Sequence, residues 1–148
     1  MIDRLTDRFV FDEVTGLPDK DVLSHSIAPG KKYLFAIIKI ENFSNLVALF
    51  GYEFSDTVSQ FASRKMIKYE QRFHYKTYQL KYNEYGILAE RKNNEAISES
   101  AQYLSEVVNA LEIESLPWER DEIHLVYRVG GALIEPGDTQ NPFSRADI

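Results

Sequence analysis

The sequence predicts an α+β fold in which a central antiparallel or mixed sheet is flanked by helices. One near-continuous apolar run has the length of a strand that is buried on both faces. Helically spaced apolar residues follow it, and two short β-prone runs joined by a polar tip come next. The chain has 148 residues and a hydrophobic content of 44%, which suit a single domain, expected over 1–148, with its own core.

The first part of the chain supplies the middle of the expected sheet. The central strand is expected over 33–40. Two consecutive helices are expected over 41–73, where apolar residues recur at steps of three or four with an interruption near Gly51. Segment 75–89 has the pattern of a β-hairpin, and its polar tip is 81–84.

The remaining segments complete the expected order of elements. A short lead-in helix is expected over 2–11, a polar-faced helix over 93–111, and a last strand over 123–134 that is interrupted at Gly130 and Gly131. The core elements then follow in the order βααββαβ.

Composition excludes several classes of function. The chain has no cysteine, so disulfides and thiolate metal sites are ruled out. Its net charge of −6 disfavours binding to nucleic acid, which needs clustered basic residues. The sequence contains neither an apolar run of membrane-spanning length nor a signal peptide, so a cytoplasmic location without membrane contact is expected. The separation of His25, His74 and His124 in the sequence favours structural roles over metal binding.

Two ungapped blocks carry a resemblance to a known family. Residues 12–20 read Asp-Glu-Val-Thr-Gly-Leu-Pro-Asp-Lys and resemble the Asp-x-Leu-Thr-Gly-Leu-Pro-Asn-Arg signature that opens GGDEF domains, the diguanylate cyclase modules of bacteria. Residues 39–56 resemble the family block Asp-Ile-Asp-x-Phe-Lys-x-Ile-Asn-Asp-x-x-Gly-His-x-x-Gly-Asp. The resemblance implies a palm-type nucleotidyl cyclase-like fold. Residues 145–147 resemble the start of the family's closing helix, which is expected to be missing after 147.

The resemblance also implies that the catalytic signature is degenerate. The place of Gly-Gly-Asp-Glu-Phe is taken by Lys81, Tyr82, Asn83, Glu84 and Tyr85. Side chains at the first two positions fill space that paired glycines leave to a nucleotide. Asn83 is still expected to adopt the left-handed turn conformation that the hairpin needs.

The metal site implied by the resemblance has lost two carboxylates. The family's first metal-binding aspartate is replaced by Lys39, whose ammonium repels a cation, and the hairpin carboxylate is replaced by the neutral amide of Asn83. We therefore expect no metal, no cofactor and no cyclase activity. We also expect Lys39 to form an ion pair with Glu84 in place of the metal.

Three residues remain candidates for binding GTP or cyclic-di-GMP without turnover. Asp56 retains half of the family's guanine clamp, whose asparagine is replaced by Val47. Arg72 retains half of the family's Arg-x-x-Asp product site, where Tyr75 stands in place of the aspartate. Lys81 is the third candidate. The competing interpretations are a helix-surface carboxylate beside a glycine turn for Asp56 and a solvated arginine at a helix end for Arg72.

The resemblance therefore implies two hypotheses that compete. In the first, the domain is an inactive module of cyclic-di-GMP signalling that regulates by contact with a neighbouring domain, such as an EAL phosphodiesterase, or with a second copy in a homodimer. It would then be part of a longer protein. In the alternative, it is a sensor of GTP or cyclic-di-GMP. A residual cyclase is the least favoured interpretation.

Overall fold

The computed structural model describes residues 11–136. The expected lead-in helix over 2–11 and the segment 145–147 fall outside this range, apart from Phe11. The described elements are α2 (Lys20–Ser26), β1 (Lys32–Ile40), α3 (Phe43–Phe50), α4 (Phe54–Lys68), α5 (Glu70–Phe73), β2 (Lys76–Lys81), β3 (Glu84–Arg91), α6 (Ile97–Ile113), β4 (Leu116–Trp118), β5 (Asp121–Ile123) and β6 (Tyr127–Ile134).

The main sheet confirms the predicted α+β architecture. Its strands lie in the order β2-β3-β1-β6, and every neighbouring pair is antiparallel, which settles the choice between an antiparallel and a mixed sheet. The central position of β1 explains its sequence, because a strand with neighbours on both sides and helices on both faces is apolar nearly throughout.

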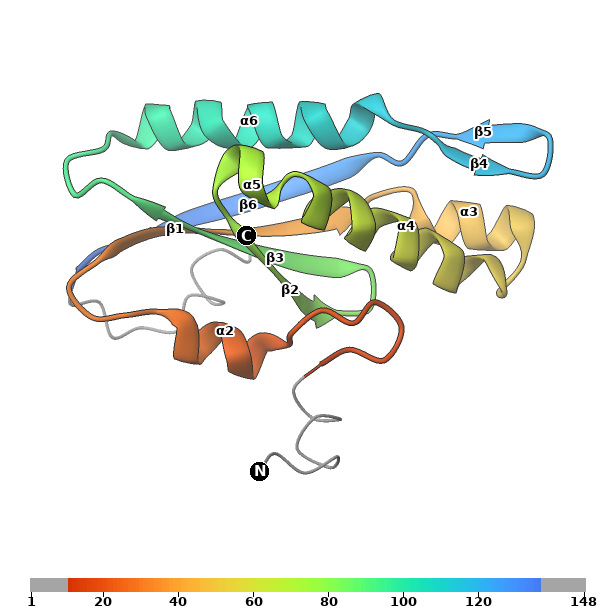
Figure 1. Cartoon of the computed structure of the whole chain (residues 1–148). Coiled ribbons are helices and arrows are strands. Elements are labelled where there is room, and N and C mark those ends of the chain that lie inside the picture. Colours follow the sequence, from red (N-terminus) through yellow and green to blue (C-terminus); the bar gives the residue numbers. More distant parts are fainter. Residues whose placement is uncertain (1–10, 137–148) are drawn as a thin grey trace.

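The two faces of β1 belong to two core clusters. Ala36 and Ile38 pack into the larger cluster beneath α4 and α6, whereas Phe35 and Ile37 pack into the smaller one with Leu23 of α2. Figure 1 shows this layering, with α4, α5 and α6 on one side of the sheet and α2 on the other. No helix within 11–136 is long and apolar enough to span a membrane.

The expectation for the last strand is wrong in two respects. Ile123 belongs to a separate short hairpin, β4–β5, and residues 124–126 lie in no strand, so β6 begins at Tyr127. Gly130 and Gly131 do not interrupt β6, because they pair in register with Ile37 and Ala36 of β1. A Cβ atom on Gly131 would lie 2.8 Å from Leu104 Cδ1, so glycine permits α6 to approach the strand closely.

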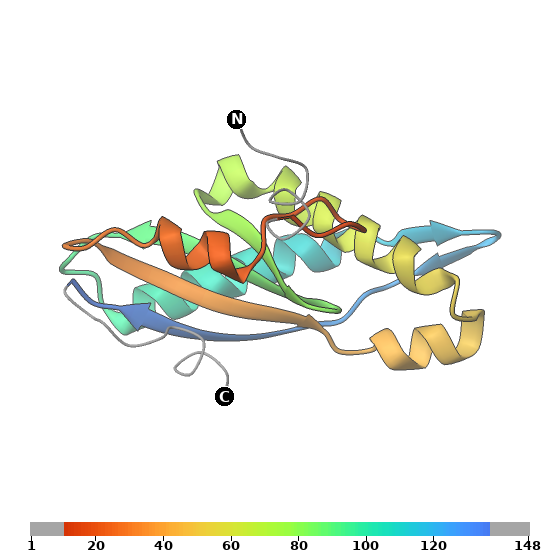
Figure 2. The ribbon, with the colours of Figure 1, turned by 90° about the horizontal axis from the view of Figure 1, so that it is seen from below.

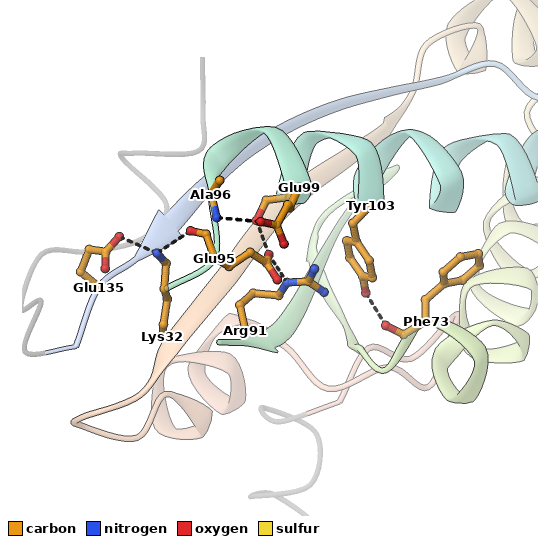
Figure 3. A network of polar contacts seen from close by, with 9 residues as sticks. Lys32, Phe73, Arg91, Glu95, Ala96, Glu99, Tyr103 and Glu135 are labelled. Carbon is orange, nitrogen blue, oxygen red and sulfur yellow. Dashed lines mark hydrogen bonds and ion pairs between the residues drawn. The ribbon is translucent and has the colours of Figure 1, made fainter. Parts of the chain in front are cut away.

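The start of α6 is fixed by a polar network (Figure 3). The carboxylate of Glu95 accepts hydrogen bonds from Arg91 Nε at 2.5 Å and from Ser100 Oγ at 2.7 Å. Lys32 Nζ donates to the main-chain oxygen of Glu95 at 3.1 Å and pairs with Glu135 Oε1 at 3.3 Å. These contacts hold the residues before Ile97 in a loop, which is why the helix begins four residues later than expected.

Candidate functional site at the hairpin tip

The β1–β3 pairing brings Lys39 and Glu84 together. The two residues are directly opposite each other in the register, so their side chains share the face of the sheet on which α2 lies. Lys39 Nζ lies 3.3 Å from Glu84 Oε1, and the side chains are 37% and 17% exposed, respectively. The ion pair expected from the sequence is therefore present.

The hairpin turn depends on Asn83. Its φ angle of 56° is left-handed, as expected from the sequence. Its main-chain oxygen accepts a hydrogen bond from the amide of Ile40 at 3.4 Å, so the turn is joined to the end of β1. The β2–β3 register shifts between Gln79 and Lys81, just before the turn. The hairpin turn thus forms with side chains at positions 81 and 82, where the family signature has glycines.

Tyr82 and Tyr85 take opposite directions from the hairpin. The ring of Tyr82 packs edge-on against Phe43, the first residue of α3, with a centroid distance of 5.2 Å. It therefore bridges the hairpin tip and α3 while remaining half exposed. Tyr85 is fully buried, and its hydroxyl donates to the main-chain oxygen of Ser59 in α4 at 3.3 Å. Burial raises the pKa of the Tyr85 phenol well above its ordinary value.

A contact that the sequence analysis missed ties the signature turn to the hairpin. Asp12 Oδ2 accepts hydrogen bonds from the amides of Val14 at 3.0 Å and Thr15 at 2.9 Å. Thr15 Oγ1 donates to Gln79 Oε1 at 2.9 Å. Gln79 Nε2 donates in turn to the main-chain oxygens of Lys81 at 2.7 Å and Glu84 at 3.3 Å. One buried glutamine thus links the turn to both strands of the hairpin.

Asp56 and Arg72, two of the three nucleotide-binding candidates, lie at opposite ends of α4. Asp56 is exposed in the first turn of α4, whereas Arg72 lies beyond the last turn of that helix. A rise of about 1.5 Å per residue leaves about 18 Å of helix between them. Lys81 is exposed at the hairpin tip. Val47, at the position of the guanine-binding asparagine, is half-buried against the core.

Arg72 and Tyr75, at the positions that resemble the family's product site, make contacts within the domain. The guanidinium carbon of Arg72 lies 4.8 Å from the ring centre of Phe73 and 5.9 Å from that of Tyr69. Tyr75 replaces the family's aspartate and points inward, where its hydroxyl donates to the main-chain oxygen of Met66 at 2.5 Å. These two positions therefore do not offer the guanidinium and carboxylate that the family's product site combines.

The residues at the family's metal positions do not fit a divalent cation. An ammonium and a neutral amide stand where hard cations need carboxylate oxygens, and the Lys39 ammonium is already paired with Glu84. Within residues 11–136, no cluster of three or more His, Asp or Glu side chains is arranged to hold a metal ion. His25, His74 and His124 are exposed; the first lies in α2, the second directly after α5 and the third directly after β5.

Solved structures share this fold. The diguanylate cyclase SiaD of Pseudomonas aeruginosa, solved with its activator SiaC, matches with a TM-score of 0.77 and 20% identity over 97% of this chain. The GGDEF domain of DgcB from Caulobacter crescentus, solved with cyclic-di-GMP, matches with a TM-score of 0.75 and 18% identity over 99% of this chain. The chain has the fold of a GGDEF domain.

The match extends to a GGDEF domain in a longer protein. Vibrio cholerae LapD, solved as an S helix–GGDEF–EAL protein bound to cyclic-di-GMP, matches with a TM-score of 0.61 and 15% identity over 86% of this chain. This chain spans 57% of the SiaD chain, 89% of the DgcB chain and 30% of the LapD chain. No protein-family model and no curated protein matches the sequence. The fold is thus retained around a hairpin tip whose residues differ from the GGDEF signature.

Proposed function

We propose that this domain is a catalytically inactive GGDEF domain that acts by contact, as a regulatory or interaction module of cyclic-di-GMP signalling in the cytoplasm. The observation that carries the proposal is the ion pair between Lys39 and Glu84 at the position of the family's metal site. On this proposal the domain keeps its fold, has no cyclase activity, and regulates other domains by binding to them.

Electrostatics support the loss of metal binding. Two like unit charges 4 Å apart near a protein surface repel by about 4 kcal/mol, and a divalent cation doubles that repulsion. A metal ion beside Lys39 would also have to displace the ammonium from Glu84. Asn83 supplies no charge that would offset either cost.

Sterics support the loss of nucleotide binding. The ring of Tyr82 lies against Phe43, so it covers the space between the hairpin tip and the start of α3. In the family signature this space is left open by two glycines that carry no side chain. The alternative function, a sensor of GTP or cyclic-di-GMP, is less well supported because Val47 stands in place of the clamp's asparagine beside Asp56, and because Arg72 lies over the rings of Phe73 and Tyr69 with Tyr75 in place of the aspartate.

The neighbouring partner is proposed by analogy with the structural relatives. LapD contains a GGDEF and an EAL domain in the same chain, and SiaD was solved with a separate activator protein. We infer that this domain similarly sits beside another signalling domain, such as an EAL phosphodiesterase, or pairs with a second copy of itself.

Calorimetric titration with GTP and with cyclic-di-GMP, each with and without magnesium, tests the proposal. We expect no binding heat in the micromolar range and no cyclic-di-GMP after prolonged incubation with GTP and magnesium. The diguanylate cyclase SiaD, with its activator SiaC, serves as the positive control. Micromolar binding that is abolished by Asp56→Ala or Arg72→Ala would instead establish the sensor, and any turnover would establish a cyclase.

A further inference from the structure

The two edge strands of the main sheet differ in how their outer sides are covered. On the β2 edge, the amide of Thr77 donates to Glu70 Oε2 at 2.9 Å. The amide of Gln79 donates to the main-chain oxygen of Pro18 at 2.8 Å. The other edge is β6, which Figure 2 shows along one long side of the molecule, next to β1. Its outer side pairs with no strand among residues 11–136, and an open strand edge is a template for a further strand.

Every second residue of β6 directs its main-chain groups away from β1. The amide of Ile40 donates to Asn83 in the hairpin tip, so Ile40 and its β6 partner Tyr127 do not bond to each other. The amide of Tyr127 instead donates to Glu112 Oε2 of α6 at 3.1 Å. Hydrogen-bonded and non-hydrogen-bonded pairs alternate along an antiparallel ladder. The outward main-chain groups that have no partner in the described part of the chain therefore belong to Val129, Gly131 and Leu133.

The sequence of β6 has few of the features that keep an edge strand from pairing. Natural edges are usually blocked by charged side chains, prolines or bulges, or are very short. β6 has eight residues, of which one is charged and none is proline. Its register with β1 is unbroken from Tyr127 to Ile134. β6 is therefore a long and regular edge that can hold a further strand.

An apolar side of α6 borders this edge. Leu104 packs over Gly131, and the exposed residues Ile97 and Ala101 precede Leu104 at helical spacing. These residues and Leu133 line a groove of about 550 Å³ between the helix and the strand. The exposed residues that flank this side of the helix are polar but uncharged: Ser98, Ser105 and Asn109. A strand added to β6 would direct every second side chain toward the groove.

The polar residues of the groove are bonded to one another. Lys32, Glu95, Ser100 and Glu135 line it together with apolar residues. Lys32 bonds to Glu95 and Glu135 in the network of Figure 3, and Ser100 donates to the Glu95 carboxylate. All other lining residues are apolar, so a side chain that enters the groove is apolar as well.

The opposite face of β6 presents a basic group. Arg128 is exposed and stands opposite Lys39 of β1 in the register. Glu84 pairs with Lys39, and exposed Glu41 lies two residues further along the chain. Among the described residues, no carboxylate forms an ion pair with Arg128. A carboxylate opposite Arg128 in an added strand would be close to it, because the Cα atoms of a non-hydrogen-bonded pair are about 4.5 Å apart.

We propose that the outer edge of β6 accepts an extended segment of a partner protein as a further strand. The segment bonds to the main chain of β6, its alternate apolar side chains enter the groove beside α6, and a carboxylate on its other face meets Arg128. A second copy of β6 does not fit this description. In a two-fold antiparallel pair that bonds through the outward residues of both copies, Arg128 faces an even-numbered residue, and no even-numbered residue of β6 is acidic. The inference rests on the proposed function, because it names the surface and the kind of segment through which the domain makes contact.

Fluorescence anisotropy with a labelled synthetic peptide tests the proposal. The probe has about eight residues in which valine alternates with glutamate and threonine, so that one face is apolar and the other is acidic. We expect saturable binding to the full chain with a micromolar dissociation constant. The control peptide has the same composition with its valines in one block. It should bind at least about tenfold more weakly, because its valines cannot all face the groove.

Two variants test the edge and the groove separately. Val129→Pro removes an outward amide that does not take part in the ladder with β1, and should weaken peptide binding by at least about tenfold. Ala101→Lys places a charge beside the groove and should also weaken binding, whether or not the proline variant folds. The matched control is Ile113→Lys near the other end of α6, where the side chain is 76% exposed. It should leave the dissociation constant unchanged, and circular dichroism checks the folding of all three variants.

Charge reversal tests the role of Arg128. Arg128→Glu should weaken binding of the glutamate peptide and strengthen binding of a peptide with lysine in place of glutamate. Equal effects on both peptides would overturn the predicted contact with a carboxylate.

The other outcomes are equally distinct. Lack of saturable binding, or equal binding of the alternating and the blocked peptide, overturns the proposal. A dimer in sedimentation that Val129→Pro abolishes, without peptide binding by the parent chain, would assign the edge to a second copy instead. Failure of the peptide together with absence of nucleotide binding leaves the inactive-domain proposal standing, whereas nucleotide binding contradicts that proposal whether or not the peptide binds.

Discussion

Lys39 and Asn83 were both interpretable from the sequence because each sits at a fixed place in a local pattern. The end of a strand and the tip of a hairpin determine where their side chains and backbone go, and the structure places both as expected. The link between Thr15 and Gln79 was not predictable in this way. It joins residues 64 positions apart, and no periodicity marks a single hydrogen bond between distant side chains.

The left-handed turn at Asn83 leads to a prediction about stability. Asn83→Val forces a β-branched residue into a φ of 56°, which costs roughly 1–2 kcal/mol of unfolding free energy. Asn83→Gly should change that free energy by less than about 0.5 kcal/mol, because glycine adopts positive φ freely. Urea denaturation measures both values. Equal losses from the two substitutions would show that the side-chain amide, and not the backbone angle, stabilises the turn.

The long helices and central strands were predicted because each repeats its apolar pattern over many residues. The strands β4 and β5 have three residues each, too few for a period of two to be recognised. The glycines of β6 were misread for a different reason. Gly131 was interpreted as a break in its own strand, whereas its effect is on the packing of α6.

The close approach of α6 to β6 predicts a specific double-mutant result. Gly131→Ala places a methyl group 2.8 Å from Leu104 Cδ1, the far end of a half-buried side chain that can shift, so it should destabilise the fold by at most about 1 kcal/mol. In a Leu104→Ala background the same substitution should cost markedly less, because the side chain that it meets has been shortened. Thermal or urea unfolding of the four proteins in the cycle gives the coupling energy. Strict additivity would mean that the strain lies elsewhere.

The network at the start of α6 predicts a pH dependence. The hydrogen bond from Arg91, with a smaller contribution from Ser100, holds the pKa of Glu95 below its usual value. Because the folded state has the lower pKa, this contribution is complete above the unfolded value of about 4.3. It is lost as the pH falls from there through the folded pKa. Glu95→Gln should therefore reduce stability at neutral pH and flatten its fall in acid, as measured by urea unfolding.

The matched control for the network is Glu99→Gln. Glu99 is exposed in the first turn of the same helix and meets the amide of Ala96 only at 3.5 Å. Glu99→Gln should leave the dependence of the unfolding free energy on acidic pH close to that of the parent chain. If both substitutions flatten the profile equally, the effect comes from the overall charge of the helix start and not from the pair between Arg91 and Glu95.

Across the domain, the residues that form the core are largely different from those at the hairpin tip. Leu80 and Tyr85, which flank the hairpin tip, pack into the core clusters, whereas the tip residues 81–84 belong to neither cluster, so these four can change without disturbing the core. This separation explains why the chain matches GGDEF structures over nearly its full length at 14–20% identity. It also implies that the tip can be altered again without loss of the fold.

If the proposed loss of binding is correct, introducing the GGDEF signature should create metal binding and GTP binding in two separable steps. Lys39→Asp with Asn83→Asp replaces the two lost carboxylates, and this variant is expected to bind magnesium without GTP. Adding Lys81→Gly and Tyr82→Gly removes the side chains that cover the space before Phe43, so magnesium-dependent GTP binding should appear in calorimetry. A version with only the two glycines is the control and should bind neither. GTP binding by that control would show that sterics alone closed the site, whereas no binding by the fourfold variant would implicate Val47.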